Sequence, residues 1–82
     1  MEHIKVYTSP RCGACLKVKA LLNKYSIPFE ELSVLDEKNR SEFLKYGQLT
    51  TPITTKGKKV VFGYSLNQLK DLIRKTAPFE AI

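Results

Sequence analysis

The sequence predicts an α/β fold in which a four-stranded mixed sheet is flanked by helices. Short runs rich in Ile, Val, Tyr and Thr, typical of strands, alternate along the chain with segments of helical periodicity. A strand, a helix and a second strand follow one another closely at the start, which indicates a right-handed parallel crossover. Two later strands flank Lys56-Gly57-Lys58 and predict an antiparallel hairpin. The expected order is β-α-β-α-β-β-α.

The length of 82 residues predicts one domain over residues 1–82. Hydrophobic residues make up 43% of the chain and charged residues 27%, which is typical of a chain that folds and excludes a disordered one. The N-terminal residues contain no basic stretch followed by a long apolar one, and no apolar run could span a bilayer. We therefore expect a cytoplasmic protein with no membrane partner.

The net charge of +6 comes from fourteen Lys and Arg against eight Asp and Glu. Such a charge permits attraction to nucleic acid or to acidic protein surfaces. The basic residues are spread from Lys5 to Lys75, however, without the clustered Arg and aromatic side chains of a nucleic-acid footprint. We expect a solvated basic surface and no nucleic-acid partner.

The first strand is predicted over residues 3–8 and ends at Ser9-Pro10. Helical spacing begins at about Gly13, so Cys12 is expected at the N-terminus of the first helix. The predicted apolar face of this helix consists of Leu16, Ala20 and Leu21, with Leu22 and Tyr25 beside it.

A second strand is predicted over residues 27–34, where apolar and polar residues alternate loosely. Asp36 can cap the helix that follows, which is expected to run through about Tyr46. We expect this second helix to bury Phe43 and Leu44 and to be polar elsewhere, as a helix that covers one face of a sheet would be.

The hairpin strands are predicted over residues 53–55 and 59–62, and Gly63-Tyr64 ends the second strand. The Ser-Leu-Asn-Gln run over residues 65–68 fits a capping box for the last helix. The apolar face of that helix is predicted to consist of Leu66, Leu69, Leu72 and Ile73.

The two cysteines of the chain, Cys12 and Cys15, lie at the first strand-to-helix junction. Unpaired backbone N–H groups and the positive end of the helix dipole favour a thiolate at Cys12, and Arg11 and Lys17 add positive charge. Such surroundings can lower the pKa of a cysteine by about a unit or more from its usual value near 8.5. We predict that Cys12 is the nucleophile and that Cys15, one helical turn further on, resolves the mixed disulfide.

Metal binding is the alternative for this cysteine pair. Cys12 and Cys15 could provide half of a zinc site, but the chain has no second cysteine pair, and its single histidine, His3, lies in the first strand. An iron–sulfur cluster shared between two chains, with extra thiols from glutathione, is a further alternative. We predict redox chemistry with no resident metal and no other bound cofactor.

Three segments carry a resemblance to a known family: Val-Tyr-Thr-Ser-Pro-Arg-Cys-Gly-Ala-Cys over residues 6–15, Thr50-Thr51-Pro52, and Gly63-Tyr64. Together they resemble glutaredoxins and the related NrdH-type redoxins, over nearly the whole chain. The Cys-x-x-Cys motif is moderately specific alone and becomes strong with the Thr-x-Pro that follows it. The resemblance implies a thioredoxin-like fold in which Pro52 is cis and lies beside the active disulfide.

The resemblance also implies an enzyme, a small thiol-disulfide oxidoreductase that reduces protein or glutathione mixed disulfides. A fixed turn at Pro52 would leave the backbone of Thr51 available to pair with an extended substrate. The substrate-binding residues that we expect are Arg11, Thr51, Pro52, Gly63, Tyr64 and Ser65.

The electron donor stays open between glutathione, which we expect as co-substrate, and thioredoxin reductase. Glutaredoxins commonly carry a Lys where this chain has Ser9 and an acid where it has Ser65. NrdH-type redoxins use thioredoxin reductase and carry a Gly-aromatic pair like Gly63-Tyr64, although their longer Trp-Ser-Gly-Phe-Arg-Pro signature is missing here. The expected partners are disulfide-containing proteins, among them ribonucleotide reductase by resemblance, and we expect a monomer.

Overall fold

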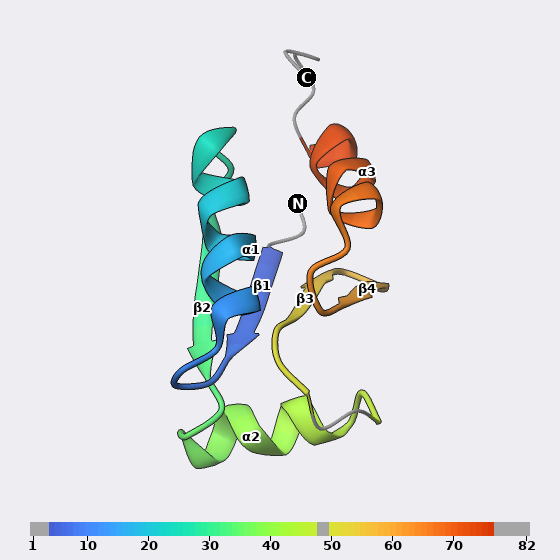
Figure 1. Cartoon of the computed structure of the whole chain (residues 1–82). Helices are drawn as coiled ribbons and strands as arrows, with labels where there is room; N and C mark the ends of the chain where they lie inside the picture. Colours follow the sequence, from blue (N-terminus) through green and yellow to red (C-terminus); the bar gives the residue numbers. More distant parts are fainter. Residues whose placement is uncertain (1–3, 48–49, 77–82) are drawn as a thin grey trace.

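The computed structural model describes residues 4–47 and 50–76 and contains the predicted order of elements (Figure 1). The elements are β1 (Ile4–Thr8), α1 (Gly13–Lys24), β2 (Phe29–Ser33), α2 (Glu37–Leu44), β3 (Ile53–Lys56), β4 (Lys59–Phe62) and α3 (Leu66–Thr76). His3, predicted as the start of the first strand, lies outside the described residues. The order β-α-β-α-β-β-α is therefore confirmed.

The strands form one mixed sheet in the order β2-β1-β3-β4. β1 and β2 are parallel, whereas β3 runs antiparallel to both β1 and β4. Lys56 pairs with Lys59, so the hairpin turn is the two-residue Gly57-Lys58. Gly57 has a φ of +61°, which glycine adopts without steric cost and which a two-residue hairpin turn needs. The predicted parallel pairing of the first two strands and the predicted hairpin are both confirmed.

The two faces of the sheet are covered by different helices. Side chains of α1 and α3 pack on the face that carries Ile4 and Val6 of β1. Tyr7, which points to the opposite face, packs with Phe43 of α2 and Ile53 of β3. This division follows from the alternation of side chains along a strand. The core therefore consists of two apolar clusters, one on each side of β1.

The buried face of α1 is rotated from the predicted one. Leu16 is 64% exposed and Ala20 is also exposed, so their assignment to the apolar face was wrong. The residues of this helix that are buried are Cys15, Val18, Leu21 and Leu22. Positions 15, 18 and 22 follow helical spacing, and Leu16 lies about 100° around the helix from Cys15. The helix therefore buries one of its cysteines.

α2 begins as predicted and ends earlier. The side chain of Asp36 caps the helix, since its Oδ1 accepts hydrogen bonds from the N–H groups of Lys38 and Asn39 at 2.9 and 3.3 Å. Phe43 is buried, but the prediction that Leu44 is buried was wrong, because Leu44 is 49% exposed. Neighbouring residues of a helix point about 100° apart, so one anchor at position 43 leaves the next side chain outside.

α3 begins at the predicted position and buries most of its predicted face. The N–H of Leu69 donates to the carbonyl oxygen of Ser65 at 2.8 Å. Leu69, Leu72 and Ile73 are buried in the cluster beneath α1 and α3. The prediction for Leu66 was wrong, because this first residue of the helix is 40% exposed and lies towards α1 rather than over the sheet.

Two substitutions in α1 test the corrected face. Leu22→Ala removes a fully buried side chain and should lower the free energy of unfolding by about 2–5 kcal/mol. Leu16→Ala is the matched control, in the same helix but exposed, and should change it by less than about 0.5 kcal/mol. Urea denaturation of the oxidised proteins measures both values. Similar losses in the two variants would contradict the packing described here.

Candidate active site

The loop after β1 delivers Cys12 to the start of α1. β1 ends at Thr8, and the chain turns through Arg11, whose φ of +59° lies in the left-handed region. Cys12 is the N-cap of α1, with extended backbone angles. Helix N-termini leave backbone N–H groups without partners inside the helix. The predicted place of Cys12 at the helix N-terminus is therefore confirmed.

Cys12 and Cys15 form a disulfide, with their Cα atoms 5.2 Å apart. The backbone N–H of Cys15 donates to the Sγ of Cys12 at 3.1 Å. Cys15 is 2% exposed, whereas Cys12 is partly exposed. Only the first sulfur is thus accessible from outside, and it is also the one that accepts a backbone hydrogen bond at the N-terminus of α1.

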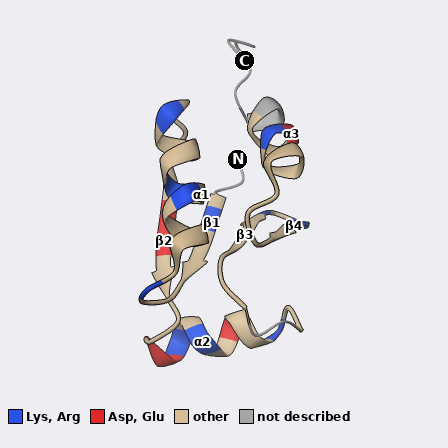
Figure 2. Cartoon of the chain, viewed as in Figure 1, with Lys and Arg blue, Asp and Glu red and all other residues tan. Residues whose placement is uncertain are grey.

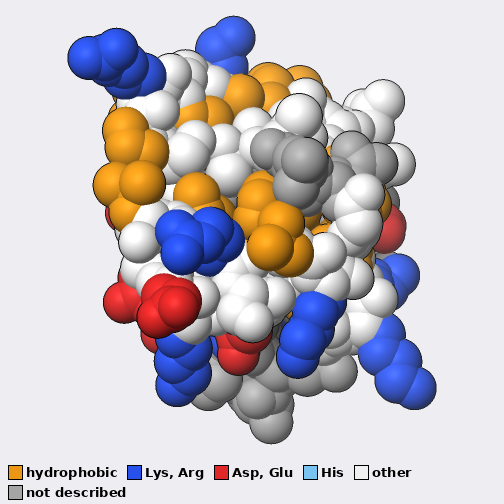
Figure 3. Space-filling model, turned by 90° about the horizontal axis from the view of Figure 1, so that it is seen from below, with side chains coloured by type: hydrophobic (Ala, Val, Ile, Leu, Met, Phe, Trp, Pro, Cys, Tyr) orange, Lys and Arg blue, Asp and Glu red, His pale blue; other side chains and the backbone are white. Residues whose placement is uncertain are grey.

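A cavity of about 350 Å³ opens beside the disulfide. It is lined by Thr8, Ser9, Arg11, Cys12, Gly13, Cys15, Leu16, Lys19 and Glu31. The cavity therefore brings Arg11 together with both cysteines. Lys17, the other cation expected near Cys12, does not line it, and Lys19 does so instead. Seen from the end of the molecule below β1 and α2, apolar side chains lie exposed between basic ones (Figure 3).

The loop before β3 is tied to the loop after β1. The Thr51-Pro52 peptide bond is cis, as the resemblance implies. The hydroxyl groups of Ser9 and Thr51 are hydrogen-bonded at 2.6 Å. The N–H of Gly63 donates to the carbonyl oxygen of Pro52 at 2.8 Å. We call residues 9–12 the cysteine loop and residues 50–52 the proline loop. The two hydrogen bonds connect both loops and the end of β4.

Tyr64 and Ser65, like Thr51, Pro52 and Gly63, do not line the cavity beside the disulfide. Tyr64 is 40% exposed, and the Nζ of Lys17 lies 5.8 Å from the centre of its ring. Ser65 is partly buried at the start of α3, where its carbonyl oxygen accepts a hydrogen bond. Among the predicted residues, Arg11 thus lines the cavity with the two cysteines, whereas Thr51, Pro52 and Gly63 belong to the hydrogen bonds that join the neighbouring loops.

Glu31 belongs to the cavity but was not predicted from the sequence. Its Oε2 accepts hydrogen bonds from the Nζ of Lys19 at 2.9 Å and from the buried hydroxyl of Thr8 at 3.1 Å. The hydrogen bond from Lys19 is the main cause that holds the pKa of Glu31 below its usual range. Partial burial opposes this shift, and the hydrogen bond from Thr8 adds to it. Glu31 pairs with Val6 in the parallel register, which places it on the same face of the sheet as Thr8.

Tyr7 lies on the face of the sheet away from α1. Its hydroxyl donates to Oε1 of Glu42 at 3.3 Å, and its ring contacts those of Phe43 and Tyr46. Burial, followed by the nearby Tyr46 and Glu42, raises its pKa above the usual value. These contacts place Tyr7 in the core on the α2 side of the sheet.

Within residues 4–47 and 50–76, no three of the His, Cys, Asp and Glu side chains are grouped as a metal ion would need. None of the three helices in that part of the chain has the length and apolar character needed to cross a membrane.

A family model described as Glutaredoxin matches residues 4–61. This match spans the cysteine loop, the proline loop and all four strands but the last residue of β4. The chain belongs to the glutaredoxin family. A glutaredoxin-like 8.6 kDa protein of Clostridium pasteurianum, described as uncharacterized and encoded in a rubredoxin operon, is 30% identical over 88% of this chain and 99% of its own length.

Other curated relatives of this glutaredoxin-family chain are matched over only 32% and 59% of their own length. Among solved structures, the thioredoxin-like protein BC3987 is 34% identical, with a TM-score of 0.79 over 84% of this chain and 97% of that one. The NrdH-redoxin of Escherichia coli shares the fold, with a TM-score of 0.76 at 22% identity over 85% and 93% of the two chains. The predicted thioredoxin-like fold is therefore confirmed.

The Glu31 network of this glutaredoxin-family chain gives a pH-dependent prediction. Because the pKa of Glu31 is lowered by folding, its contribution to stability is present above its usual value of 4.5 and is lost as the pH falls through the lowered value. Glu31→Gln should therefore lower the free energy of unfolding at pH 7, by less than about 1 kcal/mol since the side chain is 44% exposed. The difference between the variant and the wild type should therefore shrink as the pH falls below 4.5.

Urea denaturation at several pH values measures this difference. Glu30→Gln is the matched control, since Glu30 is exposed on the other face of the same strand. An effect of Glu31→Gln that stays constant down to pH 3, or that Glu30→Gln reproduces, would contradict the role given to the Lys19 hydrogen bond.

Proposed function

We propose that the chain is a dithiol-disulfide oxidoreductase that reduces mixed disulfides of proteins and glutathione through Cys12 and Cys15. Membership of the glutaredoxin family indicates, in general terms, a thiol-disulfide oxidoreductase. The observation that supports the specific mechanism is the hydrogen bond from the N–H of Cys15 to the Sγ of Cys12, at the edge of an open cavity. It stabilises negative charge on the sulfur that a substrate can reach.

The reaction proceeds in two exchanges that move two electrons to the substrate. First, the Cys12 thiolate attacks one substrate sulfur, a Cys12–substrate S–S bond forms, and the substrate S–S bond breaks with release of a thiolate. Then Cys15 attacks the Sγ of Cys12, the intramolecular disulfide forms, and the second substrate thiolate leaves. The proton that Cys15 gives up is balanced by the proton that the departing thiolate takes up.

The geometry of the pair suits this order of events. Cys15 lies in the core beneath Cys12, where it is shielded from other disulfides but stands one turn from the sulfur that it must attack. A mixed disulfide at Cys12 is therefore resolved within the protein. The product of the second exchange is the Cys12–Cys15 disulfide that the structure contains.

We place substrate binding at the loops beside the cavity. The Ser9 and Thr51 hydroxyl pair and the Gly63–Pro52 hydrogen bond hold the proline loop next to the cysteine loop, so an extended substrate could run along Thr51 and Pro52. Arg11 would attract acidic groups near the disulfide. Tyr64 and Ser65, beyond Gly63, would extend this surface towards the start of α3.

For the reducing partner we propose glutathione as co-substrate, with no resident cofactor. Thioredoxin reductase is the rival donor, because the redoxin with the same fold in Escherichia coli is described as having a thioredoxin-like activity profile. The further proposals are a cytoplasmic monomer that acts on disulfide-containing proteins, ribonucleotide reductase among the candidates.

Single cysteine variants test the two roles. Cys15→Ser should accumulate a mixed disulfide, because Cys12 still attacks but nothing inside the protein resolves the product. Cys12→Ser should neither trap substrate nor turn over above background. Intact-mass spectrometry after incubation with a glutathionylated protein detects the adduct, and circular dichroism checks the fold. Full turnover by Cys12→Ser would overturn the mechanism.

The electron donor is tested on the oxidised wild-type protein. Glutathione with glutathione reductase, and thioredoxin reductase alone, are supplied with NADPH in parallel, and NADPH oxidation is followed. Faster reduction by glutathione is expected. A clear preference for thioredoxin reductase would instead place the chain functionally with NrdH-type redoxins, and reduction by neither would contradict both couplings.

A further inference from the structure

A groove of about 390 Å³ lies between α1 and α3. It is lined by Lys17, Ala20, Leu21, Lys24, Tyr25, Tyr64, Leu66 and Lys70. The four residues from α1 have the i, i+3, i+4, i+7 spacing of one helical stripe, and the two from α3 are one turn apart. We call this hollow the α1–α3 groove. Its floor is apolar and its rim carries three lysines.

Among the residues that the structure describes, no acidic side chain lines the groove beside its lysines. No Asp or Glu is among the lining residues, and within the part of the chain that the structure describes none of these lysines forms an ion pair. The Nζ of Lys17 lies 5.8 Å from the ring centre of Tyr64, and that of Lys24 lies 5.7 Å from the ring centre of Tyr25. The aromatic rings hold the two ammonium groups along the groove.

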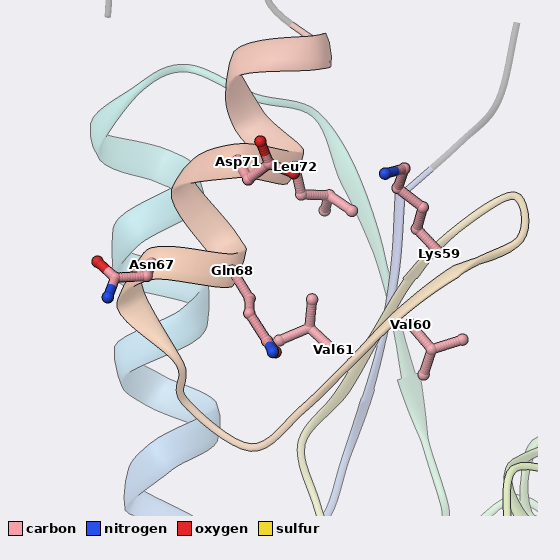
Figure 4. A pocket seen from close by; sticks show the side chains of 7 residues that line it. All are labelled: Lys59, Val60, Val61, Asn67, Gln68, Asp71 and Leu72. Atoms are coloured by element: carbon pink, nitrogen blue, oxygen red, sulfur yellow. The ribbon is translucent and has the colours of Figure 1, made fainter.

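The charged residues that line the groove are all basic, whereas those on the other side of α3 are of both signs. On its other side, a hollow against β4 is lined by Lys59, Val60, Val61, Asn67, Gln68, Asp71 and Leu72, with both signs of charge (Figure 4). α1 carries basic residues and no acidic ones, whereas α3 carries residues of both charges (Figure 2). Lys70 and Asp71 are neighbours in α3 and line different hollows. The groove is thus lined by charges of one sign because α1, which forms one of its walls, has no acidic residue.

The α1–α3 groove begins where the proposed substrate path ends. Gly63 is hydrogen-bonded to Pro52, and Tyr64, the next residue, forms part of the groove wall. Lys17 follows the resolving Cys15 by two residues and lies against that same Tyr64. A polypeptide that crosses the proline loop towards the start of α3 therefore enters the groove.

We propose that the α1–α3 groove binds an acidic, amphipathic segment of the protein whose disulfide Cys12 reduces. This inference rests on the proposed function and names the class of protein substrate that the site favours. Carboxylates of the segment would pair with Lys17, Lys24 and Lys70, and its apolar side chains would cover the half-exposed Tyr64 and Leu66.

The groove acts through association rather than through the chemistry of the sulfurs. It shares no lining residue with the cavity of Cys12 and Cys15. Complementary charge at the rim of an interface speeds encounter and is screened by salt. The preference for an acidic substrate should therefore lie in kcat/KM at low substrate concentration and should fall as salt is added.

Three synthetic peptides serve as probes. Each carries one cysteine in a mixed disulfide with 5-thio-2-nitrobenzoate, flanked on both sides by Leu alternating with Glu, Gln or Lys. The reduced wild-type protein is mixed with each probe, and release of the yellow thiolate is followed. At low salt the Glu peptide should react about tenfold faster than the Gln peptide, and the Lys peptide more slowly than either.

Two triple variants localise the effect. The groove variant carries Lys17→Gln, Lys24→Gln and Lys70→Gln. The control variant carries Lys38→Gln, Lys45→Gln and Lys58→Gln, which change the net charge equally at exposed positions in α2, at its C-cap and in the hairpin turn. The groove variant should bring the Glu-to-Gln rate ratio close to one, whereas the control variant should retain most of it.

The outcomes separate this inference from the proposed function. No reaction with any peptide would refute the oxidoreductase mechanism itself. Reaction with all peptides at equal rates, or equal loss of preference in the two triple variants, would overturn the groove alone. Sedimentation of the wild type as a dimer that the groove variant dissociates would also overturn it, because the occupant would then be a second copy.

Discussion

The packing of α1 on β1 is the constraint on which the site depends. Cys15, Val18 and Leu22 form the buried stripe of this helix, and Val6 lies in the sheet beneath it. The residue that anchors the helix start in the core is therefore Cys15, the second cysteine of the disulfide. Because the core holds Cys15, Cys12 is held at the surface, three residues earlier. The unequal exposure of the two sulfurs follows from how the helix packs.

The parts of the fold that depend on local chemistry could be predicted from the sequence. The order of elements, the Asp36 cap and the place of Cys12 are of this kind, because each rests on neighbouring residues. Leu16, Leu44 and Leu66 were assigned to buried faces in error. Each stands at the side or the end of an apolar stripe, where a rotation of one residue, about 100°, decides exposure. Periodicity predicts the stripe but leaves its rotation to the packing of the whole sheet.

The Glu31 network depends on contacts that local patterns do not contain. Its carboxylate meets Thr8 from the neighbouring strand and Lys19 from the helix above. The register that pairs Val6 with Glu31 arises from the crossover as a whole. A charged residue in a short strand reads from sequence as a solvent-facing position, and here it borders the cavity beside the disulfide. Tyr7 is close to the cysteines in the sequence, but the alternation of side chains along β1 points it to the α2 side of the sheet. Closeness in sequence therefore did not predict its position.

The two sides of α1 border different parts of the surface, the cavity at the disulfide and the groove that we propose for substrate recognition. One side presents Cys12, Cys15 and Lys19 to the cavity, and the other presents Lys17 and Lys24 to the groove with α3. A change of charge on the groove side leaves the backbone N–H that supports the Cys12 sulfur in place. Substrate choice can then vary through surface lysines while the redox pair, fixed by the core, keeps its geometry. The buried cysteine is what makes this independence possible, since it ties the reacting sulfurs to the sheet and not to the surface that meets the partner.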